Sequence, residues 1–328
     1  MQISQRNSGN QRQMNILMIT ENDPAGMGIA FTNAINRYTE HTCRLITTAT
    51  RYNFGTEKDL HVPALDEEGF GEISELLKKA DILHFHQLAD ENTELGPIRT
   101  KDFITGKAIL HHHHGHPDFR SHPNKYREKY RRLRRRALVS TPDLLKLLPE
   151  AVWQPNLVPI NAPNYLPRSI ETKTRVRVCQ APTRKDLKNT AEFEVVMASL
   201  ERKYENVEGV VIANTRHEEC LRIKQACDIH FDHMQGYYGV SSLESLSQGK
   251  PVVAGLDEWN RKNIRDFFST EDLPWISARN TIELSTVLAT LIENRALREK
   301  IGKEGRKFME VFWNERMVVE RLIGVYQQ

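Results

Sequence analysis

The sequence lacks several features that would point to particular protein classes. Its four cysteines are scattered and form no CxxC pair, which argues against a disulfide framework or a zinc site and for reduced thiols in a cytosolic protein. No apolar run reaches the length of a membrane span. The formal net charge of +3 is too small to indicate a nucleic-acid binder. What remains is a soluble globular chain of 328 residues, long enough for two domains.

The first half of the chain alternates short apolar runs with helical segments. Residues 1–13 are polar and have no apolar core, so we expect a disordered tail there and not a signal peptide. A strand at 15–20, a glycine-bearing loop at 21–28 and a helix at 29–38 then form the opening of a nucleotide-binding α/β unit. Further strands are expected at 43–47, 81–86, 107–111 and 137–140, and helices ending at 79 and covering 124–138.

A stretch with four prolines, 155–167, separates this series from a second one. In the second series, strands are expected at 175–179, 207–213 and 228–232, and helices at 190–204, 218–225, 281–293 and 295–311. Two such series predict an α/β protein of two Rossmann-like, parallel-sheet domains facing across a cleft. The expected domains are 14–165 and 166–305, followed by a C-terminal helix at 306–328 that packs back on the first domain.

The stretch from 236 to 254 is the most informative in the chain. A glycine-bearing loop leads into a short helix that carries Glu244, Gly249 ends this helix, and a buried strand follows. The N-terminus of such a helix is a site for an anion, and an acid just inside it can accept hydrogen bonds from sugar hydroxyls. This pattern indicates a nucleotide or a nucleotide sugar. The alternative is a capping box between Ser241 and Glu244, which needs no ligand.

Six fragments occur in an order that is typical of one enzyme family. They are Asp81-Ile-Leu-His-Phe-His86, His114-Gly-His-Pro-Asp-Phe-Arg120, Leu138-Val-Ser-Thr-Pro-Asp-Leu-Leu145 with Pro155-Asn156, Gln180 to Thr190, Ala226-Cys-Asp-Ile-His-Phe-Asp232, and the Glu244 segment with Gly249-Lys-Pro-Val-Val. The series resembles the retaining nucleotide-sugar glycosyltransferases of the GT-B fold, the group 1 family. The resemblance covers the chain from about residue 14 onward and is strongest from 176 to 254.

The resemblance implies a donor site mainly in the second domain, with the first domain on the acceptor side. Arg184 and Lys188 match the basic pair that holds the diphosphate, and Lys188 is also a candidate catalytic residue. Fixed cations neutralise the charge of a departing nucleoside diphosphate with little reorganisation. The alternative is a pair of solvated charges in a polar turn. Glu244 matches the acid that binds the ribose hydroxyls.

Backbone groups complete the implied donor site. The N–H groups of Gly239, Val240 and Ser241 are expected to face the phosphates, and Gly26 and Gly28 would let the first domain approach the same diphosphate closely.

The sequence departs from the family at one position. The family often has a second acid eight positions before the one matched by Glu244, and Gly236 stands there. Asp232, His233 or Gln235 could replace the missing group. The departure leaves the identity of the transferred sugar open.

The histidine run from 111 to 114 ends a predicted strand, so alternate side chains would point into the cleft and away from it. A metal site is one alternative, because imidazole is a common ligand. No carboxylate or cysteine has ligand spacing beside the run, and the resembled family needs no metal, so no metal ligand is assigned. His114 matches a catalytic-site histidine of the family, with packing under a loop as the alternative. Asp118 is a further catalytic candidate, and His116 and Arg120 are acceptor-binding candidates, although Asp118 and Arg120 could instead pair with each other.

Eight basic residues and one acid, Glu128, lie between 125 and 136. They form either a solvated helix face or a patch that meets anionic lipid headgroups or a lipid-diphosphate acceptor. Nucleic acid fits least well, because the other candidate residues point to a small-molecule site.

We therefore expect a metal-independent hexosyltransferase that uses a nucleoside-diphosphate sugar as co-substrate, no cofactor, and a glycan or lipid-linked acceptor. Surface polysaccharide or glycolipid assembly in the cytoplasm, with peripheral contact at the inner face of the membrane, fits this activity. Two rivals remain: a nucleotide-sugar epimerase of the same architecture, and a binding protein that has lost turnover. A convincing set of acid and base carboxylates is absent, which disfavours the epimerase, whereas Gly236 favours the binding protein.

Overall fold

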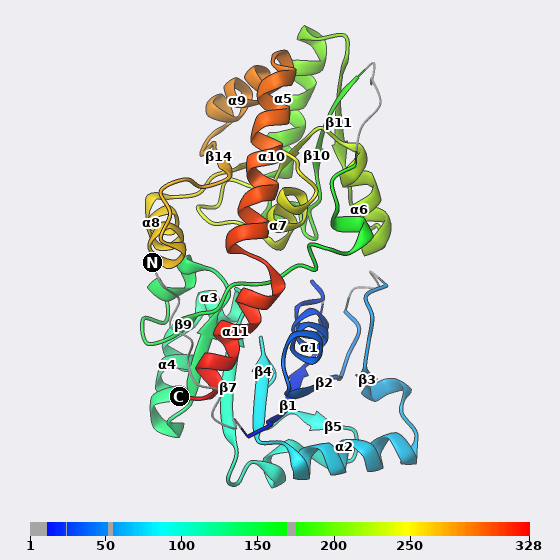
Figure 1. Cartoon of the computed structure of the whole chain (residues 1–328), viewed down its shortest axis with the longest axis vertical. Coiled ribbons are helices and arrows are strands. Elements are labelled where there is room, and N and C mark those ends of the chain that lie inside the picture. Colours follow the sequence, from blue (N-terminus) through cyan, green and yellow to red (C-terminus); the bar gives the residue numbers. More distant parts are fainter. Residues whose placement is uncertain (1–11, 24, 52–54, 169–174) are drawn as a thin grey trace.

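The computed structural model describes residues 12–23, 25–51, 55–168 and 175–328, and these form two α/β halves, one below the other in Figure 1. The polar tail predicted at 1–13 lies outside the described residues except for Arg12 and Gln13. Arg12 is anchored, because its Nη2 donates to Oδ1 of Asp81 at 2.9 Å.

The first half contains a seven-stranded parallel sheet with the order β3-β2-β1-β4-β7-β8-β9. Its strands are β1 (Asn15–Thr20), β2 (Thr42–Thr47), β3 (Leu60–His61), β4 (Ile82–His86), β7 (Ala108–His113), β8 (Arg136–Val139) and β9 (Val152–Trp153). A small antiparallel hairpin joins β5 (Glu94–Leu95) to β6 (Ile98–Arg99). The helices are α1 (Met27–Tyr38), α2 (Glu67–Lys79), α3 (Pro117–Ser121) and α4 (Pro123–Leu133), with 3₁₀ turns at Val62–Ala64, Thr100–Phe103, Pro142–Lys146 and Pro163–Tyr165.

The second half contains a five-stranded parallel sheet with the order β11-β10-β12-β13-β14. Its strands are β10 (Val176–Gln180), β11 (Val207–Val211), β12 (Ile229–Phe231), β13 (Val252–Ala254) and β14 (Trp275–Ser277). The helices are α5 (Thr190–Lys203), α6 (His217–Ala226), α7 (Val240–Ser247), α8 (Glu258–Phe268), α9 (Thr281–Glu293), α10 (Arg295–Phe312) and α11 (Glu315–Tyr326), with a 3₁₀ turn at Lys185–Leu187.

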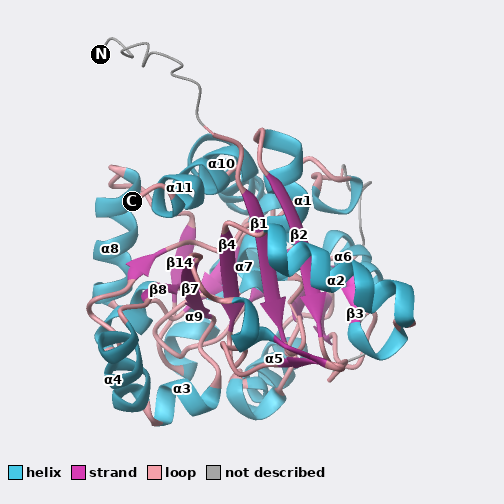
Figure 2. Ribbon diagram, turned by 90° about the horizontal axis from the view of Figure 1, so that it is seen from below, coloured by secondary structure: helices cyan, strands magenta, loops and turns pink. Residues whose placement is uncertain are grey.

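The apolar run of β1 explains the layering of the first half. All residues from Ile16 to Thr20 are buried, as expected for a central strand covered on both faces. Alternate side chains point to opposite faces, so Ile16 and Met18 share one core with α1, whereas Leu17 and Ile19 share another with α2. Figure 2 shows the strands running between helices on either side. The α/β class with two parallel sheets, predicted from the alternation, is therefore confirmed.

The chain ends with two helices, α10 near the predicted 295–311 and α11 within the C-terminal helix predicted at 306–328. α10 ends at Phe312, and Asn314 caps α11 by accepting a hydrogen bond from the N–H of Met317 at 3.1 Å. After this break, α11 returns to the first half and packs against α1 (Figure 1). Its docking includes polar contacts, because Nε2 of Gln154 donates to the carbonyl of Val318 at 3.0 Å.

Large aromatic side chains join the two halves. Tyr238 of the second half packs edge-on against Trp313, with ring centroids 5.5 Å apart, and stacks on Trp275 at 5.2 Å. Trp313 also meets Trp153 of the first sheet at 6.3 Å. All four rings are buried within one apolar cluster that includes residues of both halves. The halves are thus packed together on one side.

Two predicted boundaries near the histidine run are wrong. The helix expected at 124–138 ends at Leu133, because Arg134 adopts the left-handed region with φ 52° and β8 begins at Arg136. The strand expected to end at 111 continues to His113, so three of the four histidines lie inside β7 and are buried. Cross-strand pairing with β4 and β8 extends along these residues, which overrides the polar character of the run.

Candidate functional site

Two adjoining cavities lie where the loops of the two halves meet. One, of about 270 Å³, is lined by the start of α1 in the first half and by α6 and α7 in the second. The other, of about 110 Å³, is lined by the loop after β10 and by the same two helices. Four residues line both cavities: Ala25, His217, Val240 and Glu244. The site follows the carboxyl ends of β1 and β10, where ligands of open α/β sheets bind.

Glu244 is the most tightly held acid of this site. Its Oε2 accepts a hydrogen bond from Nζ of Lys224 at 2.6 Å, and its Oε1 lies 2.7 Å from Nε2 of His217. The Lys224 side chain is fully buried, and its Nζ also donates to the carbonyl and the hydroxyl of Ser241 at 2.9 and 2.8 Å. The network fixes the carboxylate against the start of α7.

The charges of this network are mutually dependent. Burial alone would raise the pKa of Glu244, but the charges and hydrogen bonds of Lys224 and His217 lower it to about 2. Burial likewise opposes the charged forms of both bases, yet Glu244 raises the pKa of Lys224 and of His217. Glu244 is therefore an anion at neutral pH, although only 6% of its surface is exposed.

The capping-box alternative for Glu244 is wrong. α7 begins at Val240 and its N-cap is Gly239, so Ser241 is the second helical residue and not the cap. Ser241 instead contacts Lys224 and, through its hydroxyl, Nε2 of His230 at 3.3 Å. The carboxylate of Glu244 is consequently turned to the buried bases and the cavity.

A second carboxylate occupies the N-terminus of α7. Oδ2 of Asp232 accepts hydrogen bonds from the N–H of Gly239 at 2.5 Å and from the hydroxyl of Ser242 at 2.7 Å. Lys188 Nζ lies 3.3 Å from Asp232 Oδ1, so the predicted Lys188 does meet the loop before Glu244. The N–H of Gly239 was predicted to face a phosphate, but in the structure it is already paired with this acid.

Arg184 is placed differently from Lys188. It forms an ion pair with Asp186, two residues further along, and 44% of its side chain is exposed. Neither Arg184 nor Lys188 is among the described residues that line the two cavities. The predicted basic pair is thus not together: Arg184 lies in an exposed turn, whereas Lys188 contacts Asp232.

The two glycines of the first loop serve different purposes. Gly26 lines the larger cavity and has φ 65°, a conformation that favours glycine. A Cβ on Gly28 would lie 2.9 Å from Cδ1 of Leu45, so this glycine allows α1 to pack closely on β2. The N–H groups of Gly28 and Ile29 donate to Asp23 at 3.1 and 3.0 Å. The start of α1 is therefore also capped by a carboxylate of the chain.

Backbone geometry explains why an acid is missing at Gly236. This residue has φ 91°, which is unfavourable for any side chain with a Cβ. A Cβ there would lie 3.5 Å from Oδ2 of Asp257, whose carboxylate caps α8 and pairs with Lys146 at 2.9 Å. Asp257 thus lies against Gly236, whereas Asp232 is the acid joined to Lys188.

The predicted residues of the first half surround the end of β7. His114 Nε2 lies 2.9 Å from Nδ1 of His86, its Nδ1 lies 3.1 Å from Oδ1 of Asn156, and burial lowers its pKa to about 4. His116 caps α3, because its Nδ1 accepts from the N–H of Asp118 at 3.2 Å. Both side chains are held in place by neighbours within the first half.

Asp118 and Arg120 do not pair with each other, so that alternative is wrong. Asp118 accepts a hydrogen bond from the hydroxyl of Tyr126, whereas Arg120 pairs with Asp143 at 2.8 Å. The Arg120 guanidinium also lies over the ring of Tyr237, 4.5 Å from its centroid. Arg120 therefore links the two halves.

Sequence reasoning missed His217 and Lys224, which hold Glu244. Lys224 lies in a polar-looking helix, where a lysine is normally solvated, and only the tertiary packing of α6 on α7 buries it. His217 belongs to none of the recognised fragments. No local signal distinguishes either residue.

Most of the basic run between 125 and 136 is engaged by the protein itself. Lys129 pairs with Asp90 and Glu91, Arg131 with Glu150, and Arg135 with Glu91. These pairs reduce the charge available to an external anion. Within the described ranges, no helix combines the length and apolarity that a membrane crossing needs.

Two larger hollows lie away from this site. One, of about 500 Å³, is lined by Val176, Lys250 and Arg298 at the starts of second-half elements, and another, of about 1080 Å³, runs along α4. Neither includes Glu244. The hollow along α4 is lined by residues 87–90, which follow β4, and by Asp118. The smaller pair is distinguished by its position between the two halves and by Glu244, and not by size.

The sequence matches no protein-family model and no curated protein. Solved structures share the fold. HepE of Anabaena, in complex with UDP and glucose, aligns over 96% of this chain and 100% of its own at 12% identity, with a TM-score of 0.65. A glycosyltransferase from Rickettsia africae covers 96% and 98% of the two chains at 12% identity, with a TM-score of 0.59. A putative UDP-N-acetylglucosamine 2-epimerase from Listeria monocytogenes covers 95% of each at 12% identity, with a TM-score of 0.57.

Proposed function

We propose that this protein is a glycosyltransferase that moves a hexosyl group from a nucleoside-diphosphate sugar to an acceptor hydroxyl with retention of configuration. One observation carries the proposal: Glu244 is a buried, ionised carboxylate that lines a cavity between two Rossmann-like halves. Such an acid, held by His217 and Lys224 but still lining the cavity, is suited to accept hydrogen bonds from ribose hydroxyls.

The diphosphate is assigned to the neighbourhood of Lys188 and the first turn of α7. Lys188 lies beside the position that a Cβ of Gly239 would occupy, at 2.9 Å, so a side chain at Gly239 would collide with it. A bound diphosphate would compete with Asp232 for the ammonium group. UDP in the complexes of HepE makes a uridine nucleotide the first donor to test.

In the transfer, the bond between the anomeric carbon and the β-phosphate oxygen breaks, and a bond from the acceptor oxygen forms on the same face. The acceptor proton passes to the leaving diphosphate, and Lys188 stabilises the growing negative charge. The residues at the end of β7, His114, His116, Asp118 and Arg120, are assigned to the acceptor side. The reaction requires no cofactor or catalytic metal in this scheme, and the joined halves exclude water from the donor.

A growing surface polysaccharide or a lipid-linked glycan is the proposed acceptor class, with the enzyme in the cytoplasm. Contact with anionic lipid through residues 125–136 remains a prediction. It depends on the charges that are not already paired within the protein.

The Listeria neighbour keeps a nucleotide-sugar epimerase as the alternative. A binding protein without turnover is the other alternative, and the glycine at 236 is the feature that favours it. Mass analysis of the products separates the transferase from both alternatives, because only a transferase attaches the sugar to the acceptor. An epimer has the same mass as its substrate, so proton NMR of the nucleotide sugar separates the epimerase from the binding protein.

The proposal is tested by calorimetric titration with UDP, GDP and ADP and their sugars, followed by mass analysis of incubations with candidate acceptors. We expect one nucleotide class to bind, and Glu244→Ala and Lys188→Ala each to abolish this binding. Glu91→Gln is the matched control: Glu91 is also a buried acid paired with bases, Lys129 and Arg135, but it lines neither cavity. Binding that survives both alanine substitutions would refute the donor-site assignment.

A further inference from the structure

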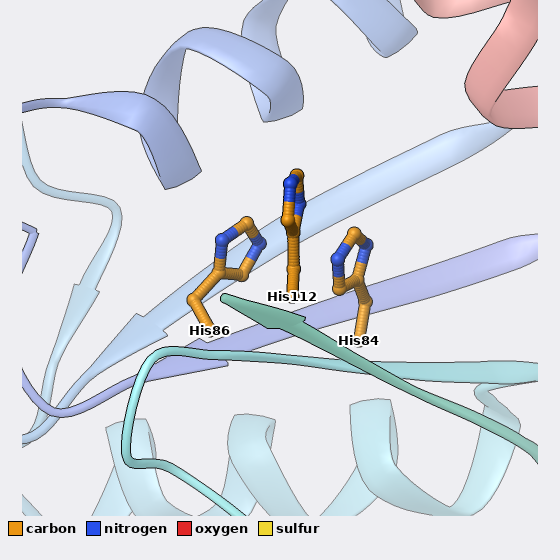
Figure 3. Close-up of side chains that lie close together, drawn as sticks. All are labelled: His84, His86 and His112. Atoms are coloured by element: carbon orange, nitrogen blue, oxygen red, sulfur yellow. The ribbon is translucent and has the colours of Figure 1, made fainter. Parts of the chain in front are cut away.

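Three imidazoles gather on one face of the first sheet (Figure 3). His84 and His86 are two residues apart on β4, and the parallel register places His112 of β7 opposite His86. Because alternate side chains of a strand share a face, all three rings lie on the same side of the sheet. Their exposures are 0%, 2% and 0%. The cluster is therefore part of the interior and not a surface patch.

The ring nitrogens of this cluster are poorly satisfied by the protein. Among the described residues, Nε2 of His84, Nε2 of His86 and both nitrogens of His112 are buried without a hydrogen-bond partner. Each unpaired buried polar atom costs about 1–3 kcal/mol. Four such atoms within one cluster point to a missing ligand, because buried polar groups are normally paired.

The surrounding hydrogen bonds fix where one of the lone pairs lies. Oδ1 of Asn156 only accepts, so Nδ1 of His114 carries the proton between them and Nε2 of His114 is bare. The proton between His114 and His86 must then sit on Nδ1 of His86, at 2.9 Å. This leaves Nε2 of His86 with a free lone pair inside the protein. Nδ1 of His84 lies 2.6 Å from the hydroxyl of Tyr326, so Nε2 of His84 is its nitrogen without a partner.

We propose that His84, His86 and His112 bind one divalent transition-metal ion of the zinc, cobalt or nickel class. Three imidazoles without a carboxylate favour these borderline ions over magnesium or calcium. One ligand nitrogen from each ring lies within 4.8 Å of the others. Tetrahedral zinc with bonds of about 2.0–2.1 Å needs nitrogens about 3.3 Å apart, so the rings must close by about 1.5 Å on binding. Water would supply the fourth ligand, because both nitrogens of the neighbouring His114 are engaged by His86 and Asn156.

The ion would have a structural role that is separate from glycosyl transfer. Tyr326 belongs to the last turn of α11 and meets His84, and the ring of Phe31 from α1 lies 5.9 Å from that of His112. The site thus lies beneath the two helices that cover this face of the sheet. Metal binding would strengthen the attachment of α11 to the first half, with the outer hydrogen bonds holding the ring orientations.

The test uses the full chain without a polyhistidine tag, stripped with a chelator and then titrated with Zn²⁺ or Co²⁺. We expect one equivalent to bind, intense visible absorption bands of four-coordinate Co²⁺, and slower amide hydrogen exchange in α11. His112→Leu should weaken binding by at least about 100-fold, more than the loss of an outer hydrogen bond costs. His113→Leu is the matched control, because His113 is equally buried on the same strand but faces the other side.

Two results would overturn the proposal. One is the absence of stoichiometric binding by the wild-type chain, which would leave the three rings as stacked neutral histidines. The other is equal binding by wild type and His112→Leu, which would place the ion on exposed histidines such as His122. The cobalt spectrum of the wild-type chain decides the coordination number even if a leucine variant fails to fold. Nucleotide binding is measured separately, so either proposal can fail alone.

Discussion

Replacement of Lys224 by methionine tests whether the charge of Glu244 depends on its buried partner. Methionine preserves most of the side-chain volume and removes the ammonium that contacts Glu244 and Ser241. Among the described residues, His217 then remains as the charged partner of the carboxylate. Breaking a buried pair by removing one partner typically costs about 3–5 kcal/mol.

The loss of stability has an upper bound, because Glu244 can bind a proton when its partner is removed. At pH 7, protonating a carboxyl whose ordinary pKa is about 4.3 costs about 3.7 kcal/mol, at 1.36 kcal/mol for each pH unit. The retained bond to His217 reduces the loss, so we expect about 3 kcal/mol. For a unit of this size, that corresponds to a fall of about 6–12 °C in the melting temperature of the second half.

The pH dependence has a definite sign. The folded pKa of Glu244 is about 2, below the ordinary glutamate value of about 4.3, so its stabilisation is fully present above about pH 4.3 and is lost as the pH falls toward 2. Without Lys224, the folded pKa rises and this acid-dependent loss disappears. The difference in stability between wild type and Lys224→Met should therefore shrink as the pH is lowered from 7 to 3.

Scanning calorimetry at several pH values measures these effects. The double variant Lys224→Met/Glu244→Leu is the control, because replacing both charges by apolar groups should recover most of the lost stability. A single variant that melts like wild type at pH 7, or one whose deficit is the same at pH 3, would refute the reasoning.

Three further predictions concern packing and charge elsewhere. Gly302→Ala would drive a Cβ into the carbonyl of Gly249 and should lower the melting temperature sharply, whereas Gly71→Ala, with nothing within 4 Å, should leave it unchanged or slightly raised in the same calorimetric scans. Trp313→Ala should cost about 3–5 kcal/mol in denaturant unfolding, and an unchanged midpoint would contradict its place in the core. The raised pKa of His217 implies stability that is full below pH 6.5 and lost as the pH rises through that pKa, so melting curves of His217→Gln should lack this alkaline loss.

The local sequence was sufficient for the alternation of strands and helices. The apolar run of β1 is a signal contained within a few residues, and the helix predicted at 281–293 is observed as α9, Thr281–Glu293. The fold class followed from the order of these elements. The boundaries failed where pairing with neighbouring strands decided the outcome, as at His112 and His113 in β7.

The candidate site was only partly predictable, because its contacts join residues far apart in the chain. Glu244 was found from its helix and loop, but its partner Lys224 lies in another helix and looks like a surface lysine. Asp232 was one of three candidates to replace the acid missing at position 236, and only the folded loop shows that it caps α7. Arg184 was paired with Lys188 by pattern, whereas a local contact with Asp186 holds it in the turn.

The aromatic joint between the halves gives the protein its own optical reporter. Three of its four tryptophans, Trp153, Trp275 and Trp313, are buried in or beside that joint, and the fourth, Trp259, reaches across to donate to the carbonyl of Pro142 at 3.0 Å. Any movement of one half relative to the other would change the environment of these indole rings together. Intrinsic fluorescence can therefore follow the movement of the two halves on ligand addition, with no label attached.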